Sequence, residues 1–240
     1  MSDQPQRSNS GAPIYRHAAS EREFAPAVGD EKNIEAIGSH ISRYVGSPDM
    51  VFHEFVSDLV HVDIHWVKPA PEHNYHTLVT SGMSDRPMAA PSPSLRYAEL
   101  LICLPPNWLL TQKAFEDERN YWPLRWLKIL ARFPHEHNTW LFASHTVPNG
   151  DPPKPFAENT RLCCALLFVP MQFDKGFHTL QVSAEKTIHF LSLIPIYREE
   201  MEFKLRKGFE PLLVRLRAVG VTELLNTQRR NSCKKRWGLF

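Results

Sequence analysis

The stretch from Tyr75 to Trp108 contains two apolar segments, YHTLVTSGMSDRPM (75–88) and RYAELLICLPPNW (96–108), joined by a loop rich in proline and serine. Val79 and the run 100–102 are residue types that a central strand buries, so we predict two strands here. Gly82 interrupts the first strand pattern, which indicates a bulge or the close approach of another backbone. Ser84 and Asp85 favour a turn, because their side chains form hydrogen bonds with local backbone.

The segment that precedes this stretch, LVHVDIHWVK (59–68), alternates between apolar and polar residues. Such alternation predicts a half-buried strand, with the polar residues on its second face: His61, Asp63 and His65. The connection through residues 69–71 is too short for a crossover helix. We therefore expect this strand to lie antiparallel to the strand that begins at Tyr75.

The rest of the chain predicts further helices and strands. Asp30 is expected to cap a helix whose apolar face carries Ile34, Ile37, Ile41 and Val45. A second helix is expected from Tyr121 to Pro134, with Trp126, Ile129, Leu130 and Phe133 facing inward. Strands are expected at 139–147, 161–170, 180–182 and 187–194, with 161–170 as a central strand, and helices at 197–207 and 209–219. The sum is an α/β or α+β domain: a mixed central sheet of about six strands with helices packed on it.

The same residues resemble the suppressor of fused domain in its bacterial form. The resemblance rests on TSGMSDRPM and RYAELLICLPPNW, and it continues in YWPLRWLKILARFPHEHNTWL, SHTVPNGDPPKPFAENT and FLSLIPIYREEMEFKLRKG. It implies an α/β fold with a central sheet. The eukaryotic family member is a cytoplasmic negative regulator that sequesters a transcription factor by holding a short peptide as an added strand between two domains. Bacterial relatives resemble immunity proteins, which neutralise toxins by direct binding.

Composition limits the organisation and the partners. Residues 1–29 are rich in Ser, Pro, Gln and Arg and predict a disordered arm, residues 30–225 form the domain, and residues 226–240 form a basic tail. The formal net charge of +2 favours neither nucleic acid nor an acidic membrane as the main partner. The beginning of the chain lacks the apolar core of a secretory signal, and no run is long enough to span a bilayer. We therefore expect a cytoplasmic protein with four reduced cysteines.

Two groups of residues have the composition of a catalytic or metal site. His61, Asp63 and His65 share one strand face and are suitable ligands for zinc, but a hydrogen-bonded, partly wet polar face is the simpler explanation, because a metal site needs a further convergent ligand. Ser84, Asp85 and His145 have the chemistry of a hydrolytic triad, but the sequence lacks the G-x-S-x-G turn, and a simple capped turn explains Ser84 and Asp85.

Two other motifs give less evidence about function. The His135-Glu136-His137 segment has the wrong spacing for a zinc helix and is expected in the loop after Pro134. Five basic residues of the tail are expected to form a solvated end or to contact an acidic partner: Arg229, Arg230, Lys234, Lys235 and Arg236. We predict no catalytic residue, no metal ligand and no cofactor.

Three classes of function remain open: a non-catalytic protein that binds and blocks another protein, a metal-dependent hydrolase that uses the face with His61, Asp63 and His65, and a structural module. The sequence favours the first, with a toxin or a regulatory protein as the partner and no nucleic acid or membrane. The partner could add a strand to a sheet edge. Residues expected to contact the partner combine the polar strand face, the motif turn and two tryptophans at element ends: His61, Asp63, His65, Met83, Ser84, Asp85, Trp108 and Trp122.

Overall fold

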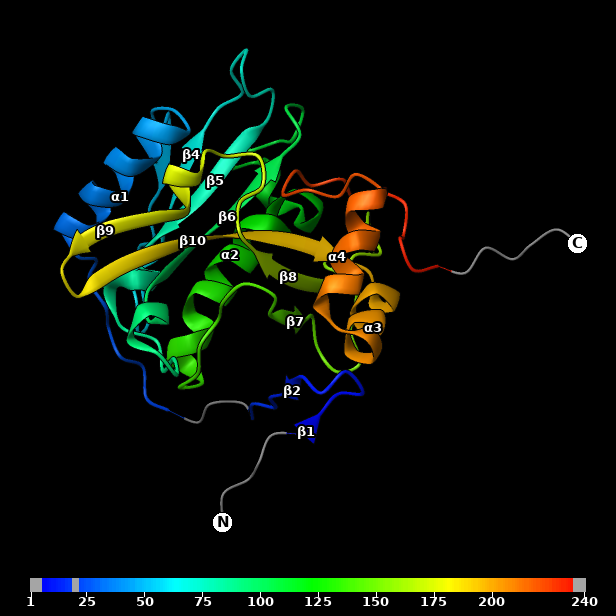
Figure 1. Cartoon of the computed structure of the whole chain (residues 1–240). Helices are drawn as coiled ribbons and strands as arrows, with labels where there is room; N and C mark the ends of the chain where they lie inside the picture. The colour runs from blue at the N-terminus through cyan, green and yellow to red at the C-terminus, as the bar shows by residue number, and fades with distance from the viewer. Residues whose placement is uncertain (1–5, 19–21, 235–240) are drawn as a thin grey trace, which may run out of the picture.

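The computed structural model describes residues 6–18 and 22–234, and these form a mixed β-sheet between layers of helices (Figure 1). The helices are α1 (Glu31–Tyr44), α2 (Glu118–Glu136), α3 (Arg198–Lys207) and α4 (Phe209–Ala218). The strands of the sheet are β3 (Met50–Phe52), β4 (Asp63–Val67), β5 (His76–Ser81), β6 (Ala98–Leu104), β7 (Thr146–Pro148), β8 (Cys164–Phe168), β9 (Thr179–Ser183) and β10 (Lys186–Ile196). The predicted mixed sheet with packed helices is confirmed, with eight strands in the described residues where the sequence indicated about six.

The strand order is β3-β4-β5-β6-β10-β8-β7, and β9 pairs with the first part of β10. The two strands of the motif stretch, β5 and β6, are antiparallel neighbours near the middle, and β4 lies antiparallel to β5 as predicted. β10 runs parallel to β6 and is the long central strand. The run 161–170, expected as a central strand, contains β8, which is buried and pairs with β10 on one side and with the short strand β7 on the other.

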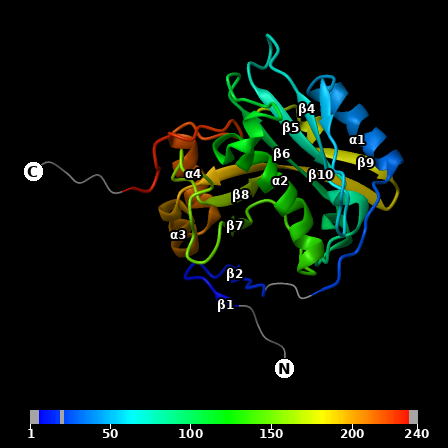
Figure 2. The ribbon, with the colours of Figure 1, turned by 180° about the vertical axis from the view of Figure 1, so that it is seen from behind.

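The sheet has helices on both faces, and the alternation of side chains along each strand shows which helix covers which face. Leu100 and Ile102 of β6 belong to the core that contains α2, whereas Leu101 and Cys103 belong to the core under α1. α4 packs on the same face of the sheet as α1, but further along it, over β8 and the end of β10. Figure 2 shows α2 in front of the sheet, with α1 and α4 to either side behind it. Both faces of the central strands are therefore buried.

Helix α1 begins as predicted, because the Asp30 side chain accepts hydrogen bonds from the backbone N–H groups of Lys32 and Asn33. Its buried face differs in part from the expected isoleucine face. Ile37 and Ile41 are buried, but so is the polar Asn33. Asn33 lies at the start of the helix and contacts the motif turn, and this contact gives the polar residue its hydrogen-bond partners.

Helix α2 is longer than the sequence indicated. It begins at Glu118, capped by Asp117, and it continues through both Pro123 and Pro134 to Glu136. Each proline removes one hydrogen bond of the helix. Both prolines are buried against the sheet, and apolar burial offsets that loss. Ile129, expected to face inward, is instead 39% exposed.

The strand expected at 139–147 is present only as β7, and residues 139–145 run irregularly before it. A turn follows Pro148, with Gly150 at a positive φ of 89°. The strands expected at 180–182 and 187–194 are confirmed as β9 and β10, which begin or end one to two residues further out. The helices expected at 197–207 and 209–219 are confirmed as α3 and α4.

The segments at the two ends of the described chain contact the domain. β1 (Gln6–Arg7) and β2 (Pro13–Ile14) form a short hairpin, and the Ser10 N–H donates to the Leu205 carbonyl of α3. The predicted disorder of residues 1–29 and the predicted domain bounds stay predictions, and residues 1–5 and 19–21 lie outside the described part. Lys235 and Arg236 of the basic tail also lie outside it. None of the described helices combines the length and the apolar character needed to cross a membrane.

Candidate partner-binding site

The polar face of β4 is buried, because α1 packs over it. Asp63 is 2% exposed, and the imidazoles of His53 and His61 each place a nitrogen 2.9 Å from one of its oxygens. The backbone N–H of Glu54 donates to the same carboxylate over 3.1 Å. Asp63 therefore holds the loop that follows β3, and the expectation that it lies on a half-exposed face is wrong.

His65 does not join this group. Its Nε2 lies 2.9 Å from the hydroxyl oxygen of Ser81 on β5, and its ring lies next to Gly38 in the middle of α1. Burial lowers the pKa of His65, although the charge of Asp63 acts in the opposite direction. His61, Asp63 and His65 thus do not converge on one point, and the described residues contain no cluster of three or more groups that could hold a metal ion.

The motif turn after β5 is organised around the buried carboxylate of Glu99. Glu99 accepts hydrogen bonds from the backbone N–H groups of Gly82 (3.0 Å) and Ser84 (2.9 Å) and from the hydroxyls of Ser84 and Thr80 (2.6 Å each). Burial raises the pKa of Glu99, and these hydrogen bonds oppose the shift. The prediction that Ser84 bonds to local backbone is wrong, because its partner lies on the neighbouring strand.

Asp85 ties the same turn to the start of α1. Its two oxygens accept from the Asp30 backbone N–H (3.1 Å) and from the Asn33 side chain (2.5 Å). Burial raises the pKa of Asp85 and outweighs these two hydrogen bonds. On the other side of the turn, Nε2 of His135 lies 2.9 Å from the Met83 carbonyl oxygen. The turn is therefore fixed from three elements, which its sequence alone did not indicate.

Three further expectations change. The described structure has no contact that joins Ser84 or Asp85 to His145, whose pKa is lowered to about 4 by burial and by the charge of Lys204. His135 and Glu136 lie in the last turn of α2, although a loop was expected there. Arg229, expected in a solvated tail, forms an ion pair of 2.6 Å with the buried Glu200.

The two tryptophans differ in accessibility. Trp122 is 0% exposed and stacks on Phe156 in the α2 core, so it cannot touch a partner as the domain stands. Trp108 is half-buried, and its indole N–H donates to the Asn120 carbonyl over 3.0 Å. Met83 is fully buried as well. Of the eight residues expected to contact a partner, only His61, Asp85 and Trp108 are more than slightly exposed.

His61 and Asp85 meet at one surface hollow. The hollow has a volume of about 310 Å³ and is lined by Pro26–Val28, Asp30, Leu59–His61, Asp85 and Arg86. Three segments of the chain therefore build it: the approach to α1, the approach to β4 and the motif turn. The lining residues 26–28 and 59 were not predicted, because nothing in the sequence indicates that these two segments pair. We take this hollow as the candidate site.

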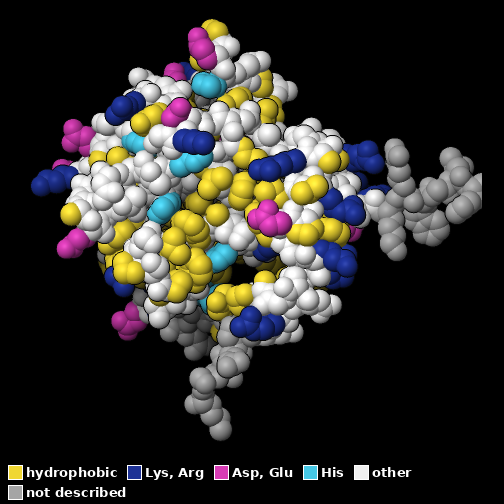
Figure 3. All heavy atoms as spheres, in the orientation of Figure 1, with side chains coloured by type: hydrophobic (Ala, Val, Ile, Leu, Met, Phe, Trp, Pro, Cys, Tyr) yellow, Lys and Arg dark blue, Asp and Glu magenta, His cyan; other side chains and the backbone are white. Residues whose placement is uncertain are grey.

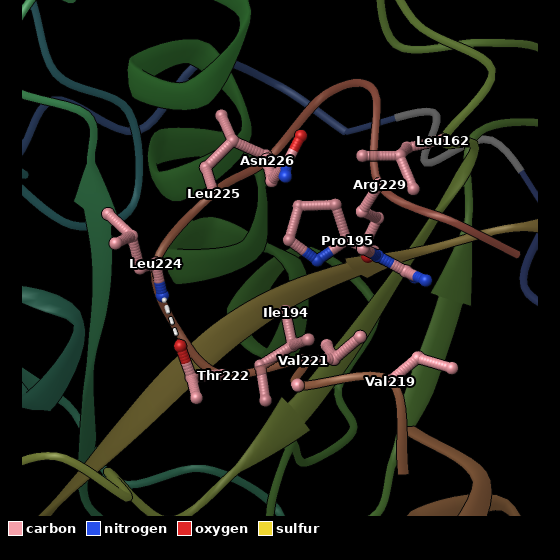
Figure 4. A pocket seen from close by; sticks show the side chains of 11 residues that line it. Leu162, Ile194, Pro195, Val219, Val221, Thr222, Leu224, Leu225, Asn226 and Arg229 are labelled. Carbon is pink, nitrogen blue, oxygen red and sulfur yellow. Dashed lines mark hydrogen bonds between the residues drawn. The ribbon is translucent and has the colours of Figure 1, made fainter. Parts of the chain in front are cut away.

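A second cavity lies where β10 diverges from β6. Its volume is about 60 Å³, and Figure 4 shows apolar side chains such as Leu162, Ile194 and Leu225 around it, with Arg229 at one side. Residues 223–225 fill the gap between these strands through hydrogen bonds with Cys103. The cavity is far smaller than the roughly 150 Å³ that accommodates benzene, so it is a packing defect and no ligand site.

Charge is unevenly distributed along the chain. Residues 198–234 hold nine Lys or Arg and five Asp or Glu, whereas the whole chain carries a formal net charge of only +2. Figure 3 shows basic side chains gathered at the end of the molecule where α3 and α4 lie. This end would attract an acidic surface at long range.

Comparison with known proteins gives a family and a fold. A family model described as Suppressor of fused protein (SUFU) matches residues 58–230. No match was found among curated proteins.

The similar solved structures agree with this match. A SUFU (suppressor of fused protein) homolog from Neisseria gonorrhoeae FA 1090 superposes with a TM-score of 0.62 at 16% identity, over 86% of this chain and all of that one. A chain of the Sufu-Fu complex superposes with a TM-score of 0.58 at 14% identity, over 87% of this chain and 93% of that one. Drosophila Suppressor of Fused superposes with a TM-score of 0.56 at 14% identity, over 88% of this chain but only 52% of that longer one.

Proposed function

This chain belongs to the suppressor of fused family, and from that premise we propose that it is a non-catalytic regulator that binds a partner protein and thereby sequesters or inhibits it. The observation that carries the proposal is the family match, which spans the motif turn, β4 to β10 and both C-terminal helices. The solved structure of the Sufu-Fu complex, which has a similar fold, supports the proposal that a partner protein is bound.

The hollow at His61 and Asp85 is the contact region that we propose. It lies beside the loop that follows β3, and β3 is an outermost strand of the sheet. An extended segment of the partner could pair with the free edge of β3, where main-chain hydrogen bonds supply affinity and neighbouring pockets supply selectivity. His61, Asp85 and Arg86 offer polar and charged groups of both signs for that selectivity.

We further propose that the protein acts in the cytoplasm as an immunity-type protein and that its partner is a toxin. The family resemblance supports this role, since bacterial relatives resemble immunity proteins. All four cysteines are free, which supports a reducing compartment. Asp63, His65, Met83, Ser84 and Trp122 are assigned to the support of the fold, since they are buried.

Co-purification tests this function. The tagged full chain is expressed in its own host, the proteins that co-purify are identified by mass spectrometry, and the dominant one is purified and titrated against the chain by calorimetry. We expect one partner that binds at a defined stoichiometry and, for a toxin, loses its activity at equimolar chain. A folded chain that retains no partner would contradict the proposal.

A further inference from the structure

The wall of the hollow at His61 and Asp85 carries more negative than positive charge. Two carboxylates, Asp30 and Asp85, line the hollow, whereas Arg86 is the only Lys or Arg among its lining residues. The Arg86 guanidinium donates to the Leu59 carbonyl over 3.4 Å and does not pair with either carboxylate. The wall therefore has one carboxylate in excess.

Asp85 is the carboxylate that lacks a counter-charge most clearly. It is partly buried, and no Lys or Arg of the described residues forms an ion pair with it, since Lys186 acts on it only at a distance. Burial raises the pKa of Asp85, and the charge of Asp30 acts in the same direction. A partly buried carboxylate without a counter-ion costs free energy, and a cation bound beside it offsets that cost.

Hydrogen-bond acceptors also outnumber donors around Asp85. Each of its oxygens accepts one hydrogen bond, from the Asp30 N–H and from the Asn33 amide. An ionised carboxylate has about four acceptor sites, so both oxygens keep an unused one. The carboxamide oxygen of Asn33 is buried and has no hydrogen-bond partner in the described structure. One oxygen of Asp30 caps α1, and we find no donor to the other among the described residues. These acceptors favour a ligand that brings several donors.

The surrounding elements add to the negative charge of the hollow. The segments that line it or pack beside it together hold nine Asp or Glu and five Lys or Arg: residues 22–35, 53–63, 82–86 and 128–136. Lys186 and the buried Glu99 also act on Asp85, with opposite signs. The N-terminus of α1 adds only about half a positive charge. The hollow therefore attracts a cation, in contrast to the basic end at α3 and α4.

Hydrogen bonds fix two of the walls before a partner arrives. The Ala27 N–H donates to the Ser57 carbonyl over 3.2 Å, and the Leu59 N–H donates to the Ala25 carbonyl over 2.9 Å. The third wall is the motif turn, which the contacts described above hold in place. A preformed site loses little conformational entropy when it binds.

We propose that the hollow binds an arginine side chain of the partner protein, with Asp85 as the carboxylate that pairs with its guanidinium and Asp30 as a second carboxylate beside it. This inference rests on the proposed function and deepens it by naming the group that the site recognises. A guanidinium presents its donors in a planar fork that matches the two oxygens of one carboxylate. Pro26, Val28 and Leu59 line the hollow and would contact the methylene groups of the arginine.

The size and the chemistry of the hollow disfavour other occupants. Its volume of about 310 Å³ is at the lower limit of small-molecule pockets and suits one long side chain. A lysine ammonium is a point charge and does not form the two parallel hydrogen bonds of a guanidinium. An arginine from the basic end of a second copy would join opposite ends of the molecule, and such head-to-tail contacts continue into filaments unless they close into a ring. We therefore assign the arginine to the partner.

Blocked arginine tests the hollow without any partner. N-acetyl-arginine methylamide is titrated into the isotope-labelled full chain and followed by NMR, with the neutral citrulline analogue as the matched control. We expect the amide signals of residues 26–30, 59–61 and 82–86 to shift with arginine, with a Kd in the millimolar range, and to stay in place with citrulline. No shift with arginine, or equal shifts with both compounds, would overturn the proposal.

Titrations of the purified partner test the pairing with Asp85. We expect Asp85→Asn to weaken binding by about 30-fold or more, and Asp30→Ser, which keeps a helix cap, by about threefold to tenfold. Arg86→Gln should bind at least as tightly as the wild type, because it removes a like charge; weaker binding would indicate an acidic ligand and overturn the proposal. Glu210→Gln is the control on α4, far from α1 (Figure 1), and should change binding by less than about twofold.

An arginine scan of the partner does not depend on how well Asp85→Asn folds. Each surface arginine of the partner is replaced by alanine and titrated against the wild-type chain. One replacement should weaken binding by about 30-fold and add little to the effect of Asp85→Asn. If no arginine behaves in this way, or a lysine does, the inference fails and the proposed function stands.

Two further outcomes separate this inference from the function beneath it. If the wild type captures no partner, the proposed function fails, whereas the titration with blocked arginine supports or overturns the arginine site by itself. Light scattering of the free chain addresses a second copy: a wild-type oligomer that Asp85→Asn converts to monomer would place an arginine of another copy in the hollow and overturn the proposal.

Discussion

Gly82 lies where the backbone of the motif turn meets the backbone before β4. An ideal Cβ at this position would stand 1.7 Å from the His61 carbonyl oxygen, and the φ of 112° is one that other residues rarely adopt. The sequence predicted a close approach of backbone at this glycine, and the structure confirms it. The close approach brings the turn next to His61, so this one residue joins two of the three segments that line the hollow.

Replacement of Gly82 by alanine should therefore destabilise the domain strongly. We expect Gly82→Ala to lower the free energy of unfolding by about 3 kcal/mol or more, because strain at positive φ adds to a clash with backbone that cannot move aside. Urea denaturation measures it. Gly220→Ala is the matched control, since Gly220 also has a positive φ (71°) but no atom near its Cβ, and it should cost only about 1–2 kcal/mol. Equal losses in both variants would contradict the role assigned to the contact.

The partners of the neighbouring polar residues could not be predicted from the sequence. Alternation along 59–68 correctly placed Asp63 and His65 on one face. It could not show that α1 covers that face, because a period of two gives the two faces but not which is buried. Ser84 and Asp85 were expected to bond locally, yet Glu99 and Asn33 supply their partners from distant elements.

Helix α3 and the C-terminal segment are joined by one buried ion pair, which is the main polar link between elements at that end of the domain. Glu200 is fully buried and accepts from both terminal nitrogens of Arg229 and from the backbone N–H and hydroxyl of Ser232. Burial alone would raise the pKa of Glu200, but the hydrogen bonds and charge of Arg229 outweigh it, and the pKa is lowered.

Loss of Arg229 should leave this carboxylate buried without its counter-charge. We expect Arg229→Met to lower the free energy of unfolding by about 3–5 kcal/mol at neutral pH, and the double variant Arg229→Met with Glu200→Met to recover much of it. Thermal and urea denaturation measure both. If Arg229→Met is as stable as the wild type, the ion pair between Arg229 and Glu200 does not stabilise the domain as we expect.

The same pair gives a pH dependence with a defined sign. Because the pKa of Glu200 is lower in the folded state than its ordinary value of 4.5, the pair stabilises fully above that value and is lost as the pH falls through the folded-state pKa. The stability difference between the wild type and Glu200→Gln should therefore shrink on acidification below about pH 4.5.

The elements themselves were predicted with uneven success for physical reasons. α1, β5, β6, β10, α3 and α4 carry clear periodicity and caps, and all were predicted. The bounds of α2 were wrong because Pro123 and Pro134, which usually end helices, are buried in the core and tolerated there. The apolar run 161–170 indicated that β8 is buried inside the sheet, but such a run does not give the order of the strands.

On the scale of the whole molecule, the proposed interface combines segments that are far apart in sequence. Residues 24–28, the loop 53–59 and the motif turn at 82–86 meet only because the sheet and α1 bring them together. The sequence indicated the motif turn and His61 as contact residues, but not residues 26–28 and Leu59, which complete the lining of the hollow.

Hydrogen–deuterium exchange of the full chain, alone and with its purified partner, tests the central claim that a partner binds at the hollow. We predict slower amide exchange on binding in residues 24–30, 53–61 and 82–86, with little change in α3 and α4. Protection centred on α3 and α4, or no protection with a partner that binds stoichiometrically, would contradict the account.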